Sequence, residues 1–243
     1  MTFLLKNKAG QPLLYEVNED CNTVTVYRDK SYELKGSLII PTSVTYERTT
    51  YRVTSIGNGV FYGCAGLTSI SIPDSVAHIG QYAFWGCTGL TSIAIPHLVT
   101  RIEDRVFDGC IGLTKISIPD SVTRIGAGAF AHCTGLTEIS IPNAVTCIGA
   151  GAFAYCIGLT EITIPDSLTK IGDVAFHGCE KLITIICKAI IPPDICLQKV
   201  YADAYRHEWN SRKRKIVVYV PAQSVEAYRN DEMWKEFNIQ HME

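Results

Sequence analysis

The sequence GAFAHCTGLTEISIP, residues 128–142, returns almost unchanged as GAFAYCIGLTEITIP, residues 151–165. The two segments are offset by 23 residues, and the same offset links residues of four types along most of the chain. A fixed period of about 20–29 residues is typical of a solenoid, in which each repeat buries its apolar face against its neighbours. The periodic residues are Cys at 64, 87, 110, 133, 156 and 179, Phe at 61, 84, 107, 130, 153 and 176, Leu at 67, 90, 113, 136, 159 and 182, and Pro at 73, 96, 119, 142 and 165.

The segment LTKISIP, residues 113–119, predicts the strand of one repeat. Side chains alternate along a strand, so Ile116 and Ile118 share the inward face, whereas Lys115 and Ser117 point away from it. Pro119 has no N–H group and ends the strand. Stacked strands lie about 4.8 Å apart, so six repeats predict a parallel sheet roughly 25–30 Å long along one side of the solenoid.

The remainder of the repeat is expected to return the chain to the next strand. Val122 and Ile125 predict a second inward segment, and Gly135 allows the turn into the next strand. Ala129 and Cys133 are four residues apart, the spacing of one helical turn, which predicts a short helical piece. The expected fold class is therefore an α/β solenoid with a parallel β-sheet, short helical turns and capped ends.

The recurring cysteines are predicted to be buried free thiols. Free cysteine is among the most buried residue types and behaves as a small hydrophobic residue. In-register side chains keep their Cβ atoms about 5 Å apart, beyond the range of about 3.5–4.5 Å found in disulfides. Zinc is not expected, because the sequence has no CxxC pair and ligands stacked in one column cannot surround an ion. We expect neither a metal nor another cofactor.

The composition is that of an ordinary globular chain, with 243 residues, of which 47% are hydrophobic and 19% charged. The formal net charge of −2 gives no general attraction to nucleic acids or anionic membranes. No apolar run approaches the ~20 residues that span a bilayer. The start, MTFLLKNKAG, has only a three-residue apolar patch before Lys6, which is too short for a secretory signal peptide. The chain is thus expected to be internal, or to be the mature or trimmed form of an exported protein.

We expect one domain with caps at both ends. Its predicted parts are an N-terminal β cap at residues 1–40, about six 23-residue coils at residues 41–191, and an irregular segment with a C-terminal strand–helix cap at residues 192–243. The caps would cover the open ends of the sheet, which could otherwise pair with other chains.

In the C-terminal part, Ser224 is a candidate N-cap of a short helix that carries Val225 and Tyr228 on one face. Trp234 and Phe237 are expected to pack on the last coil. The segment from Ile195 to Lys215 does not fit the repeat pattern. Its basic run, RKRK at residues 212–215, is expected to be a solvated loop rather than a nucleic-acid patch.

The sequence contains no motif for catalysis. None of the six histidines has metal-ligand spacing such as HExxH, and no GxSxG, phosphate loop or GxGxxG is present in a suitable context. One column of successive repeats is predicted to form a mildly basic stripe on the outside, with Cys147 exposed within it. Its members are His78, Arg101, Arg124, Cys147 and Lys170.

The repeat pattern LxxIxIPxxVxxIGxxAFxxCxxG resembles the BspA-type leucine-rich repeat, a bacterial class with a 23-residue unit. The likeness is clearest in LTSISIPDSVAHIGQYAFWGCTG, residues 67–89, and runs through about five full units, residues 67–181. The resemblance implies a right-handed leucine-rich-repeat solenoid that binds partners rather than catalyses a reaction. Relatives are typically secreted or surface proteins of commensal or pathogenic anaerobes, and some act as adhesins.

Two groups of residues are candidates for partner binding. The first lies on the side of the expected helical turns and holds residue types that dominate binding energy at interfaces: Tyr62, Tyr82 and Trp85. The second forms one column of the exposed sheet face, where partners of leucine-rich-repeat proteins often dock: Lys115, Glu138 and Glu161.

The sequence and the resemblance together predict a noncatalytic protein-binding protein. The resemblance implies a bacterial cell surface as its setting, with host proteins or other cells as partners. We expect a monomer that binds no nucleic acid and does not insert into a membrane. Two alternatives stay open: an intracellular interaction scaffold, favoured by the N-terminus and the free thiols, and an enzyme of unknown class, which no catalytic constellation supports.

Overall fold

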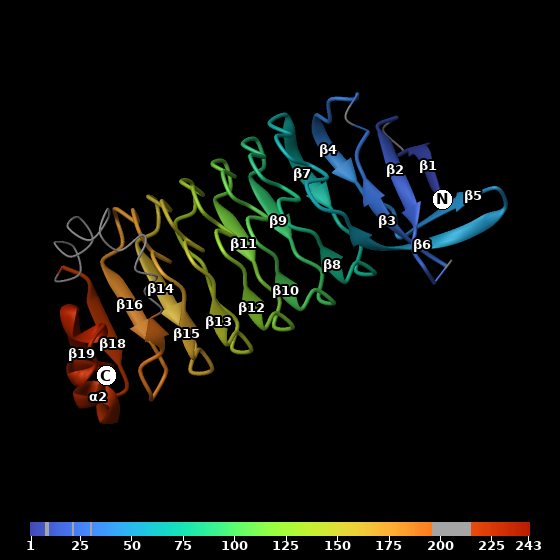
Figure 1. Cartoon of the computed structure of the whole chain (residues 1–243). Helices are drawn as coiled ribbons and strands as arrows, with labels where there is room; N and C mark the ends of the chain where they lie inside the picture. Colours follow the sequence, from blue (N-terminus) through green and yellow to red (C-terminus); the bar gives the residue numbers. More distant parts are fainter. Residues whose placement is uncertain (8–9, 21, 30, 196–214) are drawn as a thin grey trace.

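The chain folds into an elongated stack of coils, with the N-terminus at one end and the C-terminus at the other (Figure 1). This computed structural model describes residues 1–7, 10–20, 22–29, 31–195 and 215–243. Two rows of parallel strands run along the stack, one on each side of the buried core (Figure 1). The fold is therefore the predicted solenoid, with one coil for each 23-residue repeat.

The first row of strands contains the predicted LxxIxI strands. Within it, Ile116 pairs with Ile93, and Ile93 pairs with Ile70, so the isoleucines stack in register and are buried. An isolated bridge between Ser140 and Thr163 links the fourth coil to β14. The strands are β4 (Gly36–Ile39), β7 (Leu67–Ser71), β9 (Ser92–Ala94), β11 (Lys115–Ser117), β14 (Glu161–Ile164), β16 (Thr184–Cys187), β18 (Val217–Val220) and β19 (Asn238–His241).

The second row is a sheet that the sequence predicted only as an inward segment. Each strand has one inward isoleucine, such as Ile125, which is fully buried. The outward residues form the predicted basic stripe, although Cys147 is half-buried rather than exposed. The strands are β8 (His78–Ile79), β10 (Arg101–Ile102), β12 (Arg124–Ile125), β13 (Cys147–Ile148), β15 (Lys170–Ile171) and β17 (Asp194–Ile195).

The N-terminal residues form a sheet that continues directly into the solenoid. Its strands are β1 (Thr2–Lys6), β2 (Pro12–Val17), β3 (Thr23–Tyr27), β5 (Ser43–Tyr46) and β6 (Thr49–Ile56). Strand β6 pairs with β8, and β4 pairs with β7, so both rows receive an N-terminal strand. Arg28 also contacts the first coil, where its guanidinium donates hydrogen bonds to the Tyr62 carbonyl oxygen and to Cys64 Sγ.

The C-terminal strands β18 and β19 are linked by α2 (Val225–Asn230), which is flanked by the short 3₁₀ helices η1 (Ala222–Ser224) and η2 (Trp234–Glu236). Trp234 Nε1 donates to the Pro193 carbonyl oxygen at 2.8 Å, and Tyr228 Oη donates to the Ala189 carbonyl oxygen at 2.9 Å. The predicted packing of Trp234 and Phe237 is therefore observed.

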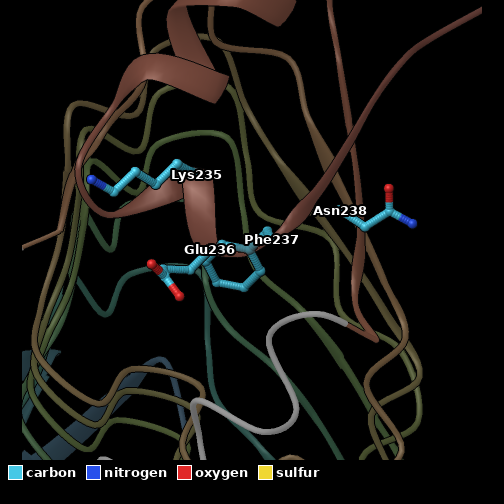
Figure 2. Close-up of a pocket in the computed structure, with 4 residues that line it drawn as sticks. All are labelled: Lys235, Glu236, Phe237 and Asn238. Carbon is cyan, nitrogen blue, oxygen red and sulfur yellow. The ribbon is translucent and has the colours of Figure 1, made fainter.

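Two details of the C-terminal part differ from, or lie beyond, the sequence prediction. Ser224 precedes α2, but its hydroxyl makes no capping hydrogen bond, so the predicted side-chain cap is wrong. The atypical segment from Ile195 to Lys215 lies outside the described residues except at its two ends. A shallow hollow at this end is lined by residues 235–238 (Figure 2), where Lys235 and Asn238 point to opposite sides.

The third side of each coil is a tight turn rather than the predicted helical piece. Alternate backbone N–H groups bond to the next coil, as Phe84 N–H does to the Val106 carbonyl oxygen at 2.9 Å, and the others bond three residues back, as Trp85 N–H does to the Tyr82 carbonyl oxygen at 3.1 Å. Each turn also has two residues with positive φ, such as Arg105 at 54° and Gly109 at 75°. A right-handed helix cannot contain this backbone conformation. The turns of successive coils instead stack along a third side of the solenoid, which we call the turn edge.

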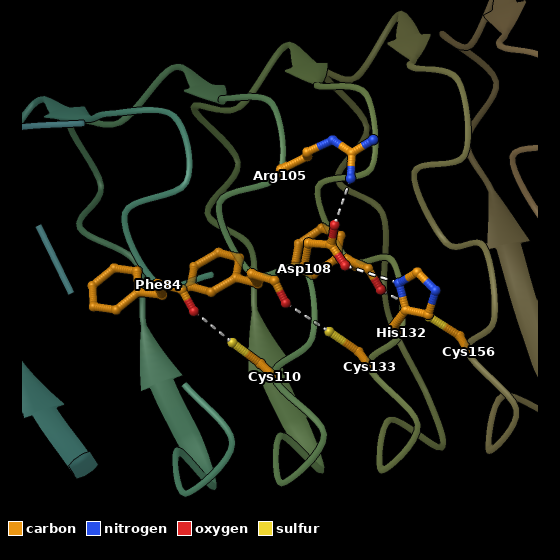
Figure 3. Close-up of polar contacts among 9 residues, drawn as sticks. Phe84, Arg105, Asp108, Cys110, His132, Cys133 and Cys156 are labelled. Atoms are coloured by element: carbon orange, nitrogen blue, oxygen red, sulfur yellow. Dashed lines mark hydrogen bonds and ion pairs between the residues drawn. The ribbon is translucent and has the colours of Figure 1, made fainter. Parts of the chain in front are cut away.

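The phenylalanine and cysteine columns fill the core behind the turn edge. Six Phe rings stack with centroid separations of 5.2–5.6 Å. From the second coil onward, each cysteine thiol of the column donates to the Phe carbonyl oxygen of the preceding coil, as Cys110 Sγ does to Phe84 at 3.1 Å (Figure 3). The cysteines of this column are buried and free, which confirms the prediction. A residue this small that also donates a hydrogen bond explains why cysteine recurs here.

The buried thiols predict a loss of stability at alkaline pH. Burial raises the pKa of Cys110 to about 12, whereas a thiol in an unfolded chain ionises near pH 8.5. The folded state therefore holds the extra proton. This stabilisation is fully present below about pH 8.5 and falls above it by about 1.4 kcal/mol per pH unit for each such thiol.

Urea unfolding between pH 7 and pH 10 measures this slope. The Cys110→Ala variant should show a slope smaller by about one proton per molecule. Thr114→Ala, a change at an exposed residue of the next strand, should keep the original slope. Equal slopes in the Cys110→Ala variant and the unmodified protein would contradict the prediction.

The phenylalanine column predicts a large effect of truncation at its centre. Phe107 is fully buried and stacks on Phe84 and Phe130, in each case at 5.5 Å. Phe107→Ala should lower the free energy of unfolding by about 3–5 kcal/mol, measured by urea denaturation. Ile111→Ala removes a half-exposed side chain from the same coil and should cost less than about 1 kcal/mol.

Candidate functional site

The candidate residues of the sheet face lie in one exposed column. Lys115 Nζ forms an ion pair with Glu138 Oε1 at 3.2 Å, and Glu161 follows in β14. Both partners of the pair are largely exposed, so the pair contributes only about 0.2–1 kcal/mol. The column therefore offers solvated polar groups without an aromatic anchor.

The aromatic candidates are brought together at the turn edge. The rings of Tyr62 and Trp85 stack with centroids 4.3 Å apart and an interplanar angle of 14°. Tyr82 precedes Trp85 in the same turn, where its carbonyl oxygen accepts the Trp85 N–H at 3.1 Å. Tyr62 and Tyr82 are 50% and 40% exposed, so these rings form a surface that is open to a partner.

Next to these rings lies a charged cluster that the sequence did not reveal. Asp108 is buried, and its two carboxylate oxygens are engaged by Arg105 and His132 (Figure 3). The Arg105 guanidinium lies 2.9 Å from Oδ2, and His132 Nδ1 lies 2.9 Å from Oδ1. Asp108 thus holds two cationic or ionisable side chains from successive coils against the turn edge.

A second ring stack continues from this cluster. The ring of His132 stacks on Tyr155 with centroids 5.0 Å apart and an interplanar angle of 8°. His177 then meets Tyr155 edge-on at 5.2 Å. Rings and charged groups therefore follow one another along six coils, from Tyr62 to His177. We call the exposed members and the half-buried Trp85 the turn-edge surface: Tyr62, Tyr82, Trp85, Arg105, His132 and Tyr155.

Four of these side chains occupy backbone positions that favour glycine. Tyr82, Arg105, His132 and Tyr155 have φ between 54° and 59°. This left-handed conformation costs an L-residue about 1–2 kcal/mol, and glycine avoids that cost. At the equivalent positions, most other coils hold glycine: Gly59, Gly128 and Gly151 in one column, where the sixth coil holds Val174 with a φ of 50°, and Gly63, Gly86, Gly109 and Gly178 in the other. The turn-edge surface thus keeps these four side chains although their backbone conformation would favour glycine.

Asp108 lies 23 residues after Trp85, so the repeat register could have placed it beside the rings. Arg105 and His132 occupy other columns, and the repeat alone does not show that their side chains turn toward Asp108.

Across the described parts of the chain, no set of three His, Cys, Asp or Glu side chains is arranged to hold a metal ion. Nor is any helix in those parts long and apolar enough to cross a bilayer.

Comparison with known proteins identifies the repeat. Residues 54–183 match the family described as BspA type leucine rich repeat region, in six copies. The structure resembles a leucine-rich repeat protein of T. pallidum (TpLRR), with 31% identity, a TM-score of 0.67, and coverage of 74% of this chain and 81% of that one. A leucine-rich repeat protein from Bacteroides ovatus ATCC 8483 shows 25% identity, a TM-score of 0.62, and coverage of 94% and 66%, respectively. No curated protein matches the sequence.

The contacts of the buried Asp108 carboxylate with Arg105 and His132 predict an effect on stability that the sheet face does not share. Asp108→Asn should lower the free energy of unfolding by about 1–3 kcal/mol, because hydrogen bonds to a charged group are lost in a buried setting. Glu138→Gln removes the same charge from an exposed pair and should cost less than about 1 kcal/mol. Chemical denaturation of both variants makes the comparison, and equal losses would contradict it.

Proposed function

Because the chain belongs to the BspA-type leucine-rich repeat family, we propose that it is a noncatalytic protein-binding protein. In this proposal the solenoid is a rigid support that presents side chains to a partner protein. Its stacked coils fix those side chains before binding, so little conformational entropy is lost when the partner docks.

The exposed Tyr62–Trp85 stack carries the proposal. Trp, Tyr and Arg are enriched among the few residues that supply most of the energy of an interface. The turn-edge surface combines all three types, and its rings are ordered by contacts with one another. The sheet-face column of Lys115, Glu138 and Glu161 is proposed as a weaker contact region, because exposed ion pairs contribute little.

The proposed setting is the bacterial cell surface, with host proteins or other cells as partners. It rests on the family resemblance. Antibody labelling of intact and permeabilised cells of the source organism, with protease treatment in parallel, tests it. We expect label on intact cells that protease removes. Label that requires permeabilisation would instead place the protein inside the cell and favour an interaction scaffold.

The binding role predicts a specific loss on truncation of the ring stack. Partners captured from surface-labelled cells by the immobilised protein should be lost, by at least about tenfold, in the Tyr62→Ala/Trp85→Ala variant. The matched control is Lys115→Ala/Glu138→Ala on the sheet face, for which we expect a change below about threefold. Undiminished capture by the Tyr62→Ala/Trp85→Ala variant would exclude the rings as the binding site.

A further inference from the structure

We propose that the outer edge of β1 pairs with the same edge of a second copy of this chain, so that two copies form a two-fold symmetric dimer. Strand β1 is the terminal strand of the N-terminal sheet and lies at the N-terminal end of the molecule (Figure 1). The inference does not depend on the proposed binding function, and it differs from the monomer expected from the sequence. Such a dimer would present two copies of the turn-edge surface.

The backbone groups of β1 point in two directions. Val17 N–H donates to the Met1 carbonyl oxygen at 2.9 Å. At the other end of the strand, Asn7 N–H donates to the Gln11 carbonyl oxygen, also at 2.9 Å. Bonding alternates along an antiparallel strand, so the odd-numbered residues of β1 bond to β2 and the even-numbered residues direct their N–H and C=O groups outward. Among the described residues, no second strand pairs with β1, and an unpaired edge of this kind is a template for a further strand.

The outward groups select one register for a second copy. They belong to Thr2, Leu4 and Lys6. In an antiparallel pair centred on Leu4, the two Leu4 residues face each other across the two-fold axis, and each Lys6 faces the Thr2 of the other copy. All three outward residues then form hydrogen-bonded pairs, with about six bonds in total. A pair centred on Lys6 would instead place two ammonium groups opposite each other, where like charges repel.

The outer face of the sheet is complementary to itself in this register. Leu4 lies opposite Leu14 in β2, and Leu14 lies opposite Tyr27 in β3. Leu4 is 43% exposed, whereas Leu14 and Tyr27 are half-buried. Joining two sheets at β1 brings the two Leu4 side chains together and extends this row of apolar residues across both copies. The exposed part of Leu4 is thereby removed from water, which favours association.

Charge favours the same arrangement. The charged residues within β1, β2 and β3 are Lys6 and Glu16, which are exposed at opposite ends of the sheet. The two-fold axis places Lys6 beside the Thr2 of the other copy, and Glu16 lies on the far side of that Thr2. Their Cα atoms are then two strands apart, about 10 Å, a gap that the two long side chains can close. Glu19 and Asp20 follow β2 and add negative charge at the same end.

The strand at the C-terminal edge has a protection that β1 lacks. In β19, Asn238 N–H donates back to the Ile216 carbonyl oxygen at 3.2 Å, so Ile239 directs its backbone groups outward. The Ile239 carbonyl oxygen accepts a hydrogen bond from Arg229 Nη2 at 3.3 Å. A charged side chain that covers an edge strand hinders its pairing with another chain. Among the described residues, no side chain bonds to the outward groups of Leu4 in this way.

Sedimentation equilibrium of the purified chain, with its affinity tag at the C-terminus, tests the inference. We expect the mass to rise from that of one chain, 26.8 kDa, toward that of two chains between about 10 µM and about 1 mM protein. Leu4→Lys places two further ammonium groups at the two-fold axis and should weaken association by at least about tenfold. The matched control is Leu98→Lys, because Leu98 is also 43% exposed but lies outside the N-terminal sheet. We expect it to change association by less than about twofold.

Charge reversal tests the register. Lys6→Glu and Glu16→Lys should each weaken association by at least about threefold, because each brings like charges together across the axis. The variant with both changes restores opposite charges and should return to within about twofold of the unmodified chain. Because Lys6 and Glu16 lie at opposite ends of the sheet within one copy, this rescue can arise only between copies. Thermal unfolding of every variant confirms that it is folded.

Amide hydrogen exchange, measured residue by residue by NMR, locates the contact. Leu4 N–H faces outward and should become more protected as the protein concentration rises, whereas Leu5 N–H is already bonded to β2 and should not change. Four results would overturn the inference: the mass of one chain at every concentration, association unaffected by Leu4→Lys, no rescue by the double charge reversal, or a dimer without added protection of Leu4. None of these experiments contains a partner protein, so their failure leaves the proposed function to be decided by the capture experiment.

Discussion

Hydrogen bonds between successive coils at the turn edge are the constraint on which the remaining structure depends. Alternate N–H groups of one turn donate hydrogen bonds to carbonyl oxygens of the next turn, so every turn must keep the same length and shape as its neighbour. From the second coil onward, this register brings each Phe ring over the preceding one and each column cysteine thiol within reach of a Phe carbonyl oxygen. A one-residue insertion within a turn would disrupt the hydrogen bonds between coils, the Phe stack and the thiol–carbonyl bonds together.

Close backbone approach reinforces this register at two glycine columns. A Cβ atom on Gly112 would lie 2.5 Å from the Thr88 carbonyl oxygen, and one on Gly126 would lie 2.7 Å from the Asp104 backbone nitrogen. Both distances are shorter than any normal contact. A side chain at Gly112 or Gly126 would therefore push the neighbouring coil away, and glycine lets the two coils lie close together. Glu103 shows how one coil deviates, since it occupies the place that Gly126 holds in the following coil.

The sequence contains enough information for most of the fold but not for the site. The 23-residue period predicts the coils, the inward isoleucines and the buried cysteines, because each depends on a position within the repeat. The spacing of Ala129 and Cys133 wrongly predicts a helical piece, because periodicity does not reveal backbone with positive φ or bonds between coils. Tyr62 and Trp85 occupy the same position of successive repeats, so their contact could be predicted from the sequence. Asp108 and His132 occupy different positions of the repeat, and their contact depends on the direction of the two side chains, which the repeat pattern does not reveal.

The common direction of the turn-edge bonds gives this edge of the molecule an electrical polarity. In ordinary sheets the peptide dipoles alternate and largely cancel. Along the turn edge the bonded N–H groups face the C-terminal end, so their dipoles add as they do in an α-helix. The negative, carbonyl end of this series lies at the first coil, where the Arg28 guanidinium meets the Tyr62 carbonyl oxygen as a counter-charge. The turn edge is therefore a row of aligned peptide dipoles along the solenoid axis, and each added coil lengthens this row.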